Sequence, residues 1–496
     1  MEKESKTEMD LIAEERYTFV IVGGGIAGVT CAETTAICCP EQPILLLTES
    51  NIIKTVANLE PVARYLYKFD VQERTLAGTC EESSKRLFYP TVTTQVGTLQ
   101  HVDATDKYII TSRGKKIFYE YLCICTGGRP RLIEANNPLV LGIRDTDSVL
   151  ELQKRLEKSK SVVLVGNGGI ASELAYELKG VEVHWVVRDN HIASTFIDPG
   201  AAFFFQQAMD KKQEQTSSTQ SPENARGIIK RLRFNEITAS TIDSKKGAAL
   251  GPDWHKNFEL KGSCCSENTP KIHFKSVIKS MCDIFDETQN KKLMKVELST
   301  GEVLFCDFVV SATGVDPRLD YSCKPPLNID ATDNGISVNE MMQTSNEYVF
   351  AAGDVCTASW DKADHWFQMR LWTQARQMGS MAGRSMAAHF LNETIYQDFC
   401  FELFGHVTQL FGLSVILLGR YNGQGLGTNY EILLRTTPGQ EYIKFILKDG
   451  KLRGAILIGN TELAETCENL ILNGIDLTPF GDDILNPDID IDDYFD

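Results

Sequence analysis

Short apolar runs that end at glycine recur along the first three quarters of the chain. Residues 17–22 read YTFVIV, and a glycine-rich turn, a helical stretch and a second apolar run, PILLL at 43–47, follow them. Continuous apolar runs of this length are typical of strands buried on both faces of a parallel sheet. The order strand, turn, helix, strand predicts a βαβ unit at the start of an α/β domain.

The same pattern returns at residue 161. SVVLV at 161–165 is followed by the turn GNGG, the helical stretch IASELAYEL and a further apolar run at 181–187. We therefore expect two nucleotide-binding folds of one design, whose openings lie about 140 residues apart.

The apolar pattern weakens between residues 206 and 280, which predicts an insertion in the second fold. Within it the polar stretch 213–227 lacks apolar periodicity and is predicted to be a mobile loop. Nearer the C-terminus, 442–459 indicates a hairpin around Lys448-Asp449-Gly450, and 463–474 an amphipathic helix that ends at glycine.

Composition narrows the class of protein. A chain of 496 residues is expected to form about two to four domains. No apolar run approaches the ~20 residues of a membrane-spanning helix, and the polar residues 1–16 argue against a secretory signal. The net charge of −17 disfavours direct nucleic-acid binding. The 14 cysteines are scattered, which fits a reducing, intracellular compartment.

The first glycine motif spans Gly23 to Gly28 and lies between a strand and a helix. Its glycines permit a tight turn, a close approach of the backbone to a diphosphate, and close packing of the helix on the strand. An acidic residue for ribose hydroxyls is expected about 20 residues later, and Glu49 is the candidate. The expected cofactor contacts here are Gly23, Gly24, Gly25, Ile26, Ala27, Gly28 and Glu49.

The second motif, at 166–171, is a GxGxxA in the same context. Arg188 follows the next strand, and an arginine there suits the 2′-phosphate of NADPH, although a surface ion pair is the alternative. The choice between NADH and NADPH therefore stays open. The expected contacts are Gly166, Gly168, Gly169, Ile170 and Arg188.

Three further segments join strands to turns: 121–130, 308–317 and 348–355. The last of them contains Asp354, which the strand places at a binding site. Its carboxylate can accept hydrogen bonds from the ribityl hydroxyls of a flavin. A helix N-cap is the alternative role for Asp354. The contacts expected from these segments are Cys125, Thr126, Gly127, Gly314, Gly353, Asp354 and Val355.

In this order the five segments resemble the pyridine nucleotide-disulphide oxidoreductase superfamily. The resemblance implies bound FAD, NAD(P)H as substrate, and transfer of a hydride from nicotinamide to flavin. It also implies that Glu173 approaches the nicotinamide, with Lys54 as a candidate partner near the flavin. The implied α/β architecture has two Rossmann-like three-layer domains and a small α+β domain. Its parts are an FAD domain at 15–145 and 310–395, an NAD(P)H domain at 146–309, an α+β domain at 396–485, and an acidic tail or docking peptide at 486–496.

The sequence departs from the reductases of this superfamily in its cysteines. Their CxxxxC pair follows the second strand, but residues 51–69 contain no cysteine, and the CxxC of other members is missing too. Cys264-Cys265 lie in the insertion, and Cys31, Cys123 and Cys125 are expected to pack in the core. His406 lacks the proline of the family's His-Pro motif and is expected to be structural. The histidines form no ligand-spaced cluster, so no metal site is predicted.

Closer matches within the superfamily, carried by stretches such as LGIRDTDS, ALGPDWH and MRLWTQARQMG, imply a more specific role. They imply association with the tRNA-splicing ligase complex in the nucleus and cytoplasm, and use of NAD(P) to protect that complex from oxidative inactivation. Electron delivery to oxygen or a small acceptor is the alternative, and a scaffold without cofactor is a third. The sequence leaves the oligomeric state open.

Overall fold

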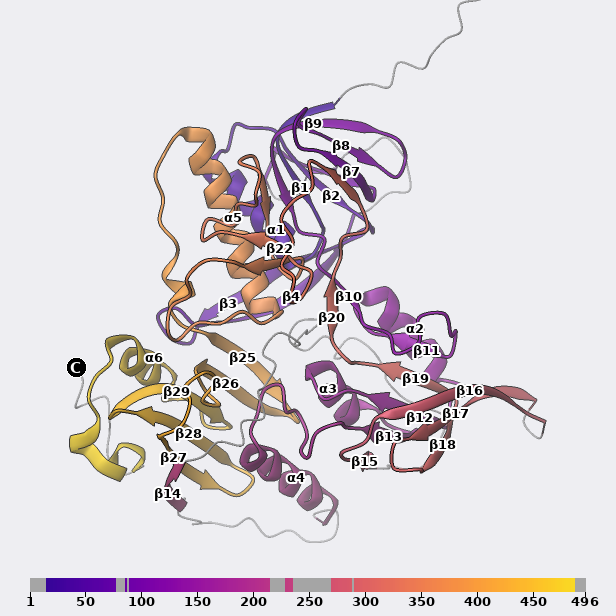
Figure 1. The fold of residues 1–496 in the computed structure, drawn as a ribbon, viewed down its shortest axis with the longest axis vertical. Coiled ribbons are helices and arrows are strands. Elements are labelled where there is room, and N and C mark those ends of the chain that lie inside the picture. Colours follow the sequence, from indigo (N-terminus) through magenta and orange to yellow (C-terminus); the bar gives the residue numbers. More distant parts are fainter. Residues whose placement is uncertain are drawn as a thin grey trace, which may run out of the picture.

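The computed structural model of the chain describes residues 15–76, 85–86, 89–214, 228–234, 269–287 and 290–486. Three bodies are visible in Figure 1: an upper α/β body, a lower α/β body and a C-terminal body of antiparallel strands. The predicted fold class is confirmed. Cys264-Cys265 and the tail from residue 487 lie outside the described residues, and the predicted domain boundaries stay predictions.

The first body is built on a mixed sheet whose central strands are parallel. β1 (Glu15–Val22) lies between β2 (Ile44–Thr48) and β9 (Lys116–Ile124), and β23 (Val349–Ala351) pairs with the end of β9. Strands from both 15–145 and 310–395 therefore share one sheet. The other strands are β5 (Lys85–Arg86), β6 (Val92–Val96), β7 (Leu99–Asp103), β8 (Tyr108–Thr111) and β21 (Ser322–Lys324).

Two helices of this body pack closely because α5 carries small residues at the contact. They are α1 (Ile26–Cys38) and α5 (Trp372–Leu391). A Cβ on Gly379 would lie 2.3 Å from the carbonyl oxygen of Ala27. Two small pairs complete the body: the hairpin β3 (Ile52–Pro61) with β4 (Tyr67–Thr75), and β22 (Ile336–Val338) with β24 (Cys356–Ala358).

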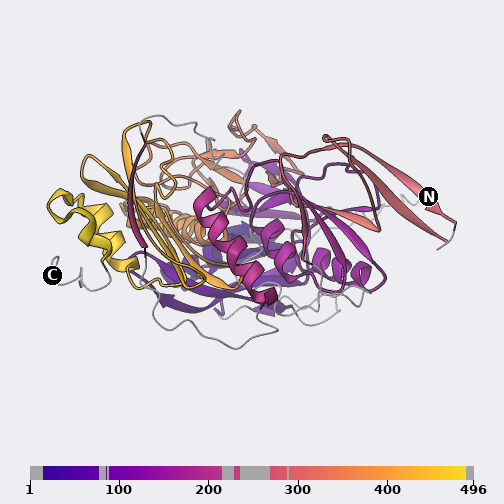
Figure 2. The same cartoon turned by 90° about the horizontal axis from the view of Figure 1, so that it is seen from below.

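The second body contains a parallel sheet in the order β11-β19-β12-β13-β15. Its antiparallel strands β16 to β18 form an arm that projects from one end of the molecule in both views (Figures 1 and 2). The elements are β11 (Val140–Gly142), α2 (Thr146–Leu156), β12 (Ser161–Val165), α3 (Gly169–Glu177), β13 (Glu182–Val186), α4 (Pro199–Glu214), β15 (Lys271–His273), β16 (Ile278–Asp286), β17 (Lys291–Leu298), β18 (Val303–Cys306) and β19 (Phe308–Ser311). Short strands β10 (Gly128–Pro130) and β20 (Val315–Pro317) pair where the chain crosses between the two bodies.

The C-terminal body is an antiparallel sheet in the order β14-β27-β28-β29-β26-β25, with β14 (Ile228–Phe234) at one edge. The predicted hairpin is confirmed as β28 and β29, and the predicted helix is confirmed as α6, which ends at the left-handed Gly474. The elements are β25 (Gly405–Leu410), β26 (Leu413–Gly419), β27 (Tyr430–Thr437), β28 (Glu441–Lys448), β29 (Lys451–Ile458), α6 (Ala464–Asn473) and the 3-10 helices η2 (Phe399–Phe401) and η3 (Thr478–Leu485).

The described residues of the insertion include a helix end and a strand, which corrects part of the prediction for this region. Residues 213 and 214 are the end of α4 rather than the start of a loop. Strand β14 (Ile228–Phe234) leaves the second body and pairs with β27 of the C-terminal sheet. Backbone pairing to a distant strand is not visible as local periodicity, so the pattern of the insertion alone does not reveal it.

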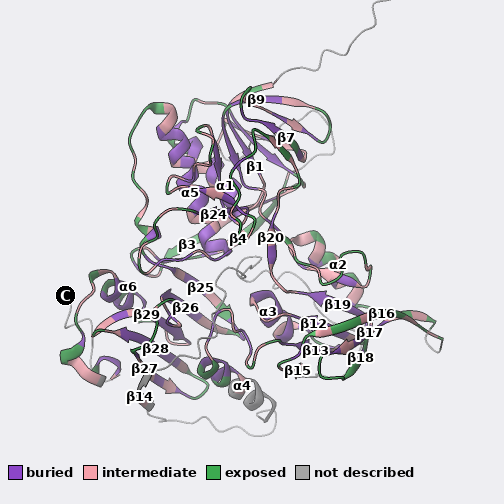
Figure 3. Ribbon diagram, in the orientation of Figure 1, coloured by how far each residue is buried: buried purple, intermediate pink, exposed green. Residues whose placement is uncertain are grey.

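Buried residues concentrate in the strands and in α1 and α5, whereas β16 of the arm carries only exposed and half-buried residues (Figure 3). Within the part of the chain that the structure describes, no helix is long and apolar enough to cross a membrane.

Candidate functional site

A cavity of about 540 Å³ opens where the carboxyl ends of β1, β2 and β9 meet. Ligands of α/β folds bind at this edge of the sheet, and small-molecule sites are commonly ~300–1,000 Å³ in volume. The predicted residues that line the cavity are Gly23, Gly24, Gly25, Ile26, Ala27, Glu49, Lys54, Cys125, Thr126, Gly127, Ile170 and Asp354.

The first glycine loop is held against a turn of the neighbouring strand. Gly23 has a φ of 131°, and a Cβ there would lie 2.0 Å from the carbonyl oxygen of Cys125. A Cβ on Gly28 would lie 2.0 Å from the carbonyl oxygen of Gly23, so Gly28 supports the loop rather than lining the cavity. Gly25 is the N-cap of α1 and receives no side-chain cap, and a Cβ there would meet no atom within 4 Å. The helix therefore offers N–H groups to an anion such as a diphosphate.

Asp354 follows β23 and brings a carboxylate to the cavity wall. Burial raises the pKa of this carboxyl group, and the positive charges of Arg370 and Arg144 oppose that shift. Gly353 forms the turn with a φ of 82°, and Val355 is fully buried, so these two residues support the carboxylate without lining the cavity. Asp354 is not the cap of a helix.

Two arginines that sequence reasoning missed line the same cavity. Arg318 donates to both carboxylate oxygens of Glu49, with Nη2 at 2.7 Å from Oε1. This contact lowers the pKa of Glu49 and raises the pKa of Arg318. The pKa of Arg144 is lowered by burial and by the nearby Arg318. The predicted ribose ligand Glu49 is thus part of an ion pair, and Arg318 lies 269 positions away in the chain, so no local signal connects the two.

Lys54 lies on β3 and lines the cavity, and the carboxylate that the structure places beside it belongs to Glu73. The Nζ of Lys54 lies 3.7 Å from Oε1 of Glu73, which is directly opposite on β4. Burial lowers the pKa of Lys54, and the Glu73 carboxylate opposes that shift. Glu173 lies one helical turn beyond Ile170 on α3 and is half-buried. The cross-strand pairing of the hairpin brings Glu73 to Lys54, and the role of Glu173 stays a prediction.

The wall beside Lys54 is apolar. The rings of Trp372 and Phe69 meet edge to face at 4.6 Å between centroids, and both belong to a small core cluster with Ile26. Behind Trp372 lies His406, whose Nδ1 is 3.1 Å from the Thr373 hydroxyl. Burial lowers the pKa of His406 to about 3. This fully enclosed histidine fits the predicted structural role.

Among the described residues, one cysteine lines the cavity, and it is Cys125. Its Sγ lies 3.5 Å from Sγ of Cys123, and both are buried together with Cys31. Core packing is confirmed for these three residues. Burial raises the pKa of Cys31 and of Cys123, which disfavours their thiolates.

The second glycine loop repeats the design of the first. Gly166 has a φ of 133°, and a Cβ there would lie 2.1 Å from the carbonyl oxygen of Ala312. Gly168 is the N-cap of α3, and Gly314 forms the facing turn with a φ of 107°. The predicted residues Gly166, Gly168, Gly169, Glu173, Arg188 and Gly314 do not line the first cavity. Ile170 and Val315 do line it, so the cavity extends to this loop.

The carboxylate beside the second loop belongs to Asp189, which sequence reasoning missed. Asn167 Nδ2 and Ser194 Oγ donate to its Oδ2 at 2.8 and 2.6 Å. These bonds outweigh the effect of burial and lower the pKa of Asp189. The Arg188 side chain is 71% exposed. The strand ends at Val186, and Asp189 is the acidic residue that follows it.

No group of three or more His, Cys, Asp or Glu side chains among the described residues is placed to hold a metal ion.

Comparisons with known proteins agree with this geometry. Residues 17–227 and 271–379 match the model of the pyridine nucleotide-disulphide oxidoreductase family, and 408–475 match that of the rubredoxin NAD+ reductase C-terminal domain. Pyridine nucleotide-disulfide oxidoreductase domain-containing protein 1 of Drosophila melanogaster is 58% identical over 96% of this chain and 99% of its own. The human protein of that name is 42% identical over 96% and 98%. The ferredoxin reductase of Rhodopseudomonas palustris shares the fold with a TM-score of 0.62 at 18% identity, over 93% of this chain and 96% of its own.

Proposed function

This chain belongs to the pyridine nucleotide-disulphide oxidoreductase family, and we propose that it oxidises NAD(P)H through bound FAD without a redox-active disulphide. The observation that carries this proposal is the hairpin of β3 and β4. It spans the region where the reductases hold their CxxxxC pair, it contains no cysteine, and it presents Lys54 to the cavity instead.

The residues of the cavity fit FAD. The uncapped N-terminus of α1 and the close contact of Gly23 with Cys125 form a cradle that a side chain would fill. Arg144 and Arg318 bring positive charge to the same wall, and Asp354 brings a carboxylate that can accept from ribityl hydroxyls. When bound, FAD supplies the two-electron chemistry, and the protein supplies position and electrostatics.

The residues of this chain have separable tasks in the proposed reaction. Trp372, Ile26 and Phe69 keep water from one side of the cavity. Lys54 holds a positive charge at its wall, where negative charge on a reduced ring system would be stabilised. Ile170, which follows the second glycine loop, lines the cavity. A nicotinamide dinucleotide bound at the second loop would therefore lie next to the FAD site.

The finer part of the proposal concerns what receives the electrons. We propose that the protein acts in the nucleus and cytoplasm, and that it uses NAD(P)H to protect the tRNA-splicing ligase complex from oxidative inactivation. The resemblance of the whole chain to its closer relatives supports this role. Delivery of electrons to oxygen or another small acceptor is the second candidate, and the hairpin of β3 and β4, which carries no cysteine to pass electrons on, favours it.

Two experiments test these functions. The purified protein should bind FAD and show flavin absorption, and anaerobic NAD(P)H should bleach that absorption. A protein that takes up no FAD would contradict the enzymatic proposal. For the finer role, the tagged protein is used to capture the ligase complex with and without NAD(P)H. Capture only with the nucleotide supports protection, whereas no capture in either condition, with rapid oxygen-dependent NAD(P)H oxidation, supports the second candidate.

A further inference from the structure

Glu73 occupies a central place between two elements that bound the cavity. It faces Lys54 across the antiparallel ladder of β3 and β4, with 3.7 Å between Nζ and Oε1. The Lys54 side chain is 19% exposed and that of Glu73 is 36% exposed. Lys54 lines the cavity and Glu73 lies beside it, and solvent screens the pair only in part.

The same carboxylate reaches the second body. Oε1 of Glu73 accepts a hydrogen bond from the hydroxyl of Thr146, the first residue of α2. Thr146 itself lines the cavity. The start of α2 is fixed in turn, because Asp145 accepts from the backbone N–H of Ser148 at 3.0 Å and both arms of a capping box are present. One oxygen atom of Glu73 thus joins the hairpin, the lysine and the helix.

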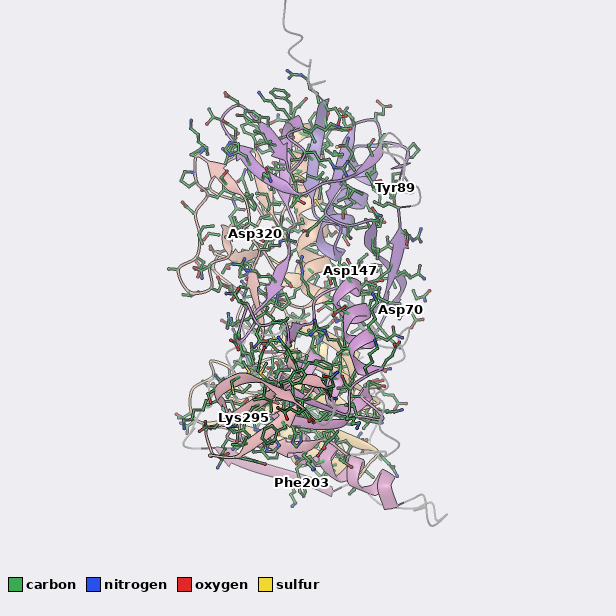
Figure 4. All side chains as sticks on the ribbon, turned by 90° about the vertical axis from the view of Figure 1, so that its right-hand side faces the viewer. Asp70, Tyr89, Asp147, Phe203, Lys295 and Asp320 are labelled. Carbon is green, nitrogen blue, oxygen red and sulfur yellow. The ribbon has the colours of Figure 1, made fainter. Side chains whose placement is uncertain are left out.

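The charges that act on Lys54 come from β4 and from the segment before α2. Glu73 and Asp145 favour the protonated amine, whereas burial and Arg144 disfavour it. Glu73 is the carboxylate in direct contact. Asp70, on the same hairpin, instead accepts from Nδ2 of Asn58 at 2.7 Å on the exposed side. Figure 4 labels Asp70 on this hairpin and Asp147 on α2.

We propose that Glu73 is a positioning residue for the proposed reaction: it fixes the Lys54 ammonium at the cavity wall and ties its hairpin to α2 through Thr146. The inference rests on the proposed function, because it assigns Lys54 to the flavin site. A neutral residue at position 73 would fix the position of the Lys54 amine less firmly. It would also favour the protonated form of that amine less.

The direct test measures the titration of the Lys54 amine in the FAD-containing protein. Lysine acylation is followed by mass spectrometry over a range of pH in the parent protein, in Glu73→Gln, in Glu73→Asp and in the control Asp70→Asn. Near neutral pH we expect Lys54 in Glu73→Gln to react about three- to tenfold faster, because its pKa falls by up to about one unit. Glu73→Asp should restore part of the original rate, and Asp70→Asn should match the parent.

A second readout separates positioning from a merely structural role. The rate of flavin reduction by NAD(P)H in Glu73→Gln should follow a pH profile displaced to lower pH, while FAD remains bound. Thr146→Val, which keeps the Glu73 carboxylate, should leave both the reactivity of Lys54 and this pH profile close to those of the parent protein.

Equal acylation of Lys54 in Glu73→Gln and Asp70→Asn would overturn the inference, even if every variant reduces its flavin normally. Failure of the proposed function would look different. The parent protein would then show no flavin reduction, whereas the acylation difference between Glu73→Gln and Asp70→Asn would still be measurable.

Discussion

Arg370 holds the backbone of Asp354 from behind the cavity. Its Nε donates to the carbonyl oxygen of Asp354 at 2.9 Å, and its Nη2 lies 3.0 Å from Oδ2 of Asp333. The Arg370 side chain is 4% exposed. The turn that carries the cavity's carboxylate is therefore tied to a buried ion pair.

Replacement of Arg370 by Met should weaken FAD binding and destabilise the first body. Removal of one member of a buried ion pair leaves the other charge uncompensated, which typically costs about 3–5 kcal/mol. We expect the Kd for FAD to rise at least about tenfold, since ~1.4 kcal/mol of lost binding free energy suffices for that. Titration of apoprotein with FAD measures it, with Arg113→Met at an exposed position as control. Equal affinity in both variants would contradict the role of Arg370.

Gly379 should tolerate no side chain. A Cβ there would lie 2.3 Å from the carbonyl oxygen of Ala27, so α5 would have to move away from α1. Overpacking of this kind costs about 1–3 kcal/mol of unfolding free energy. Urea denaturation of Gly379→Ala should show this loss, whereas Ser380→Ala, one position along on the same helix, should leave the midpoint unchanged or higher.

Asp189 should favour NADH over NADPH. Its carboxylate is placed beside the second glycine loop by Asn167 and Ser194, where it can accept from ribose hydroxyls but would repel a 2′-phosphate. Loss of a hydrogen bond to a charged group costs about 1.5–3 kcal/mol. We expect Asp189→Ala to weaken NADH binding about tenfold or more and to leave NADPH binding little changed. Equilibrium titration with each nucleotide measures this, and the exposed Arg188→Ala should change neither by as much.

His406 should make the protein less stable in mild acid. Its folded-state pKa is lowered to about 3 by burial, whereas an unfolded histidine titrates near pH ~6.5. Below that pH the histidine is protonated in the unfolded chain but stays neutral in the folded chain. The free energy of unfolding therefore falls as pH decreases from ~6.5 towards ~3, by up to ~1.4 kcal/mol per pH unit. The variant His406→Gln should lose this slope in urea denaturation at different pH values. The half-buried control His101→Gln should keep it.

The parts of the site that the sequence predicts are those with a local signal. Gly23 and Gly166 turn with φ values of 131° and 133°, a backbone conformation that favours glycine, and Asp354 follows a buried strand. These constraints act within a few residues, so they are visible in the pattern. The hairpin at β28 and β29 and the helix α6 are visible for the same reason.

Other contacts depend on chain segments that only the fold brings together. Arg318 meets Glu49 across 269 positions, and β14 crosses from the insertion to β27. Glu73 reaches Lys54 because the register of the hairpin places the two opposite each other. No spacing rule within a single segment predicts such partners, because a long side chain can reach several different residues once the chain is folded.

We propose that FAD takes electrons from NAD(P)H in a site without a redox-active disulphide. Anaerobic titration of the purified FAD-containing protein with NAD(P)H tests this claim most directly, because it counts the electrons that the site accepts. One equivalent of nucleotide per FAD should abolish the oxidised flavin spectrum. Consumption of two equivalents before full reduction would reveal a second two-electron acceptor, and it would contradict the account.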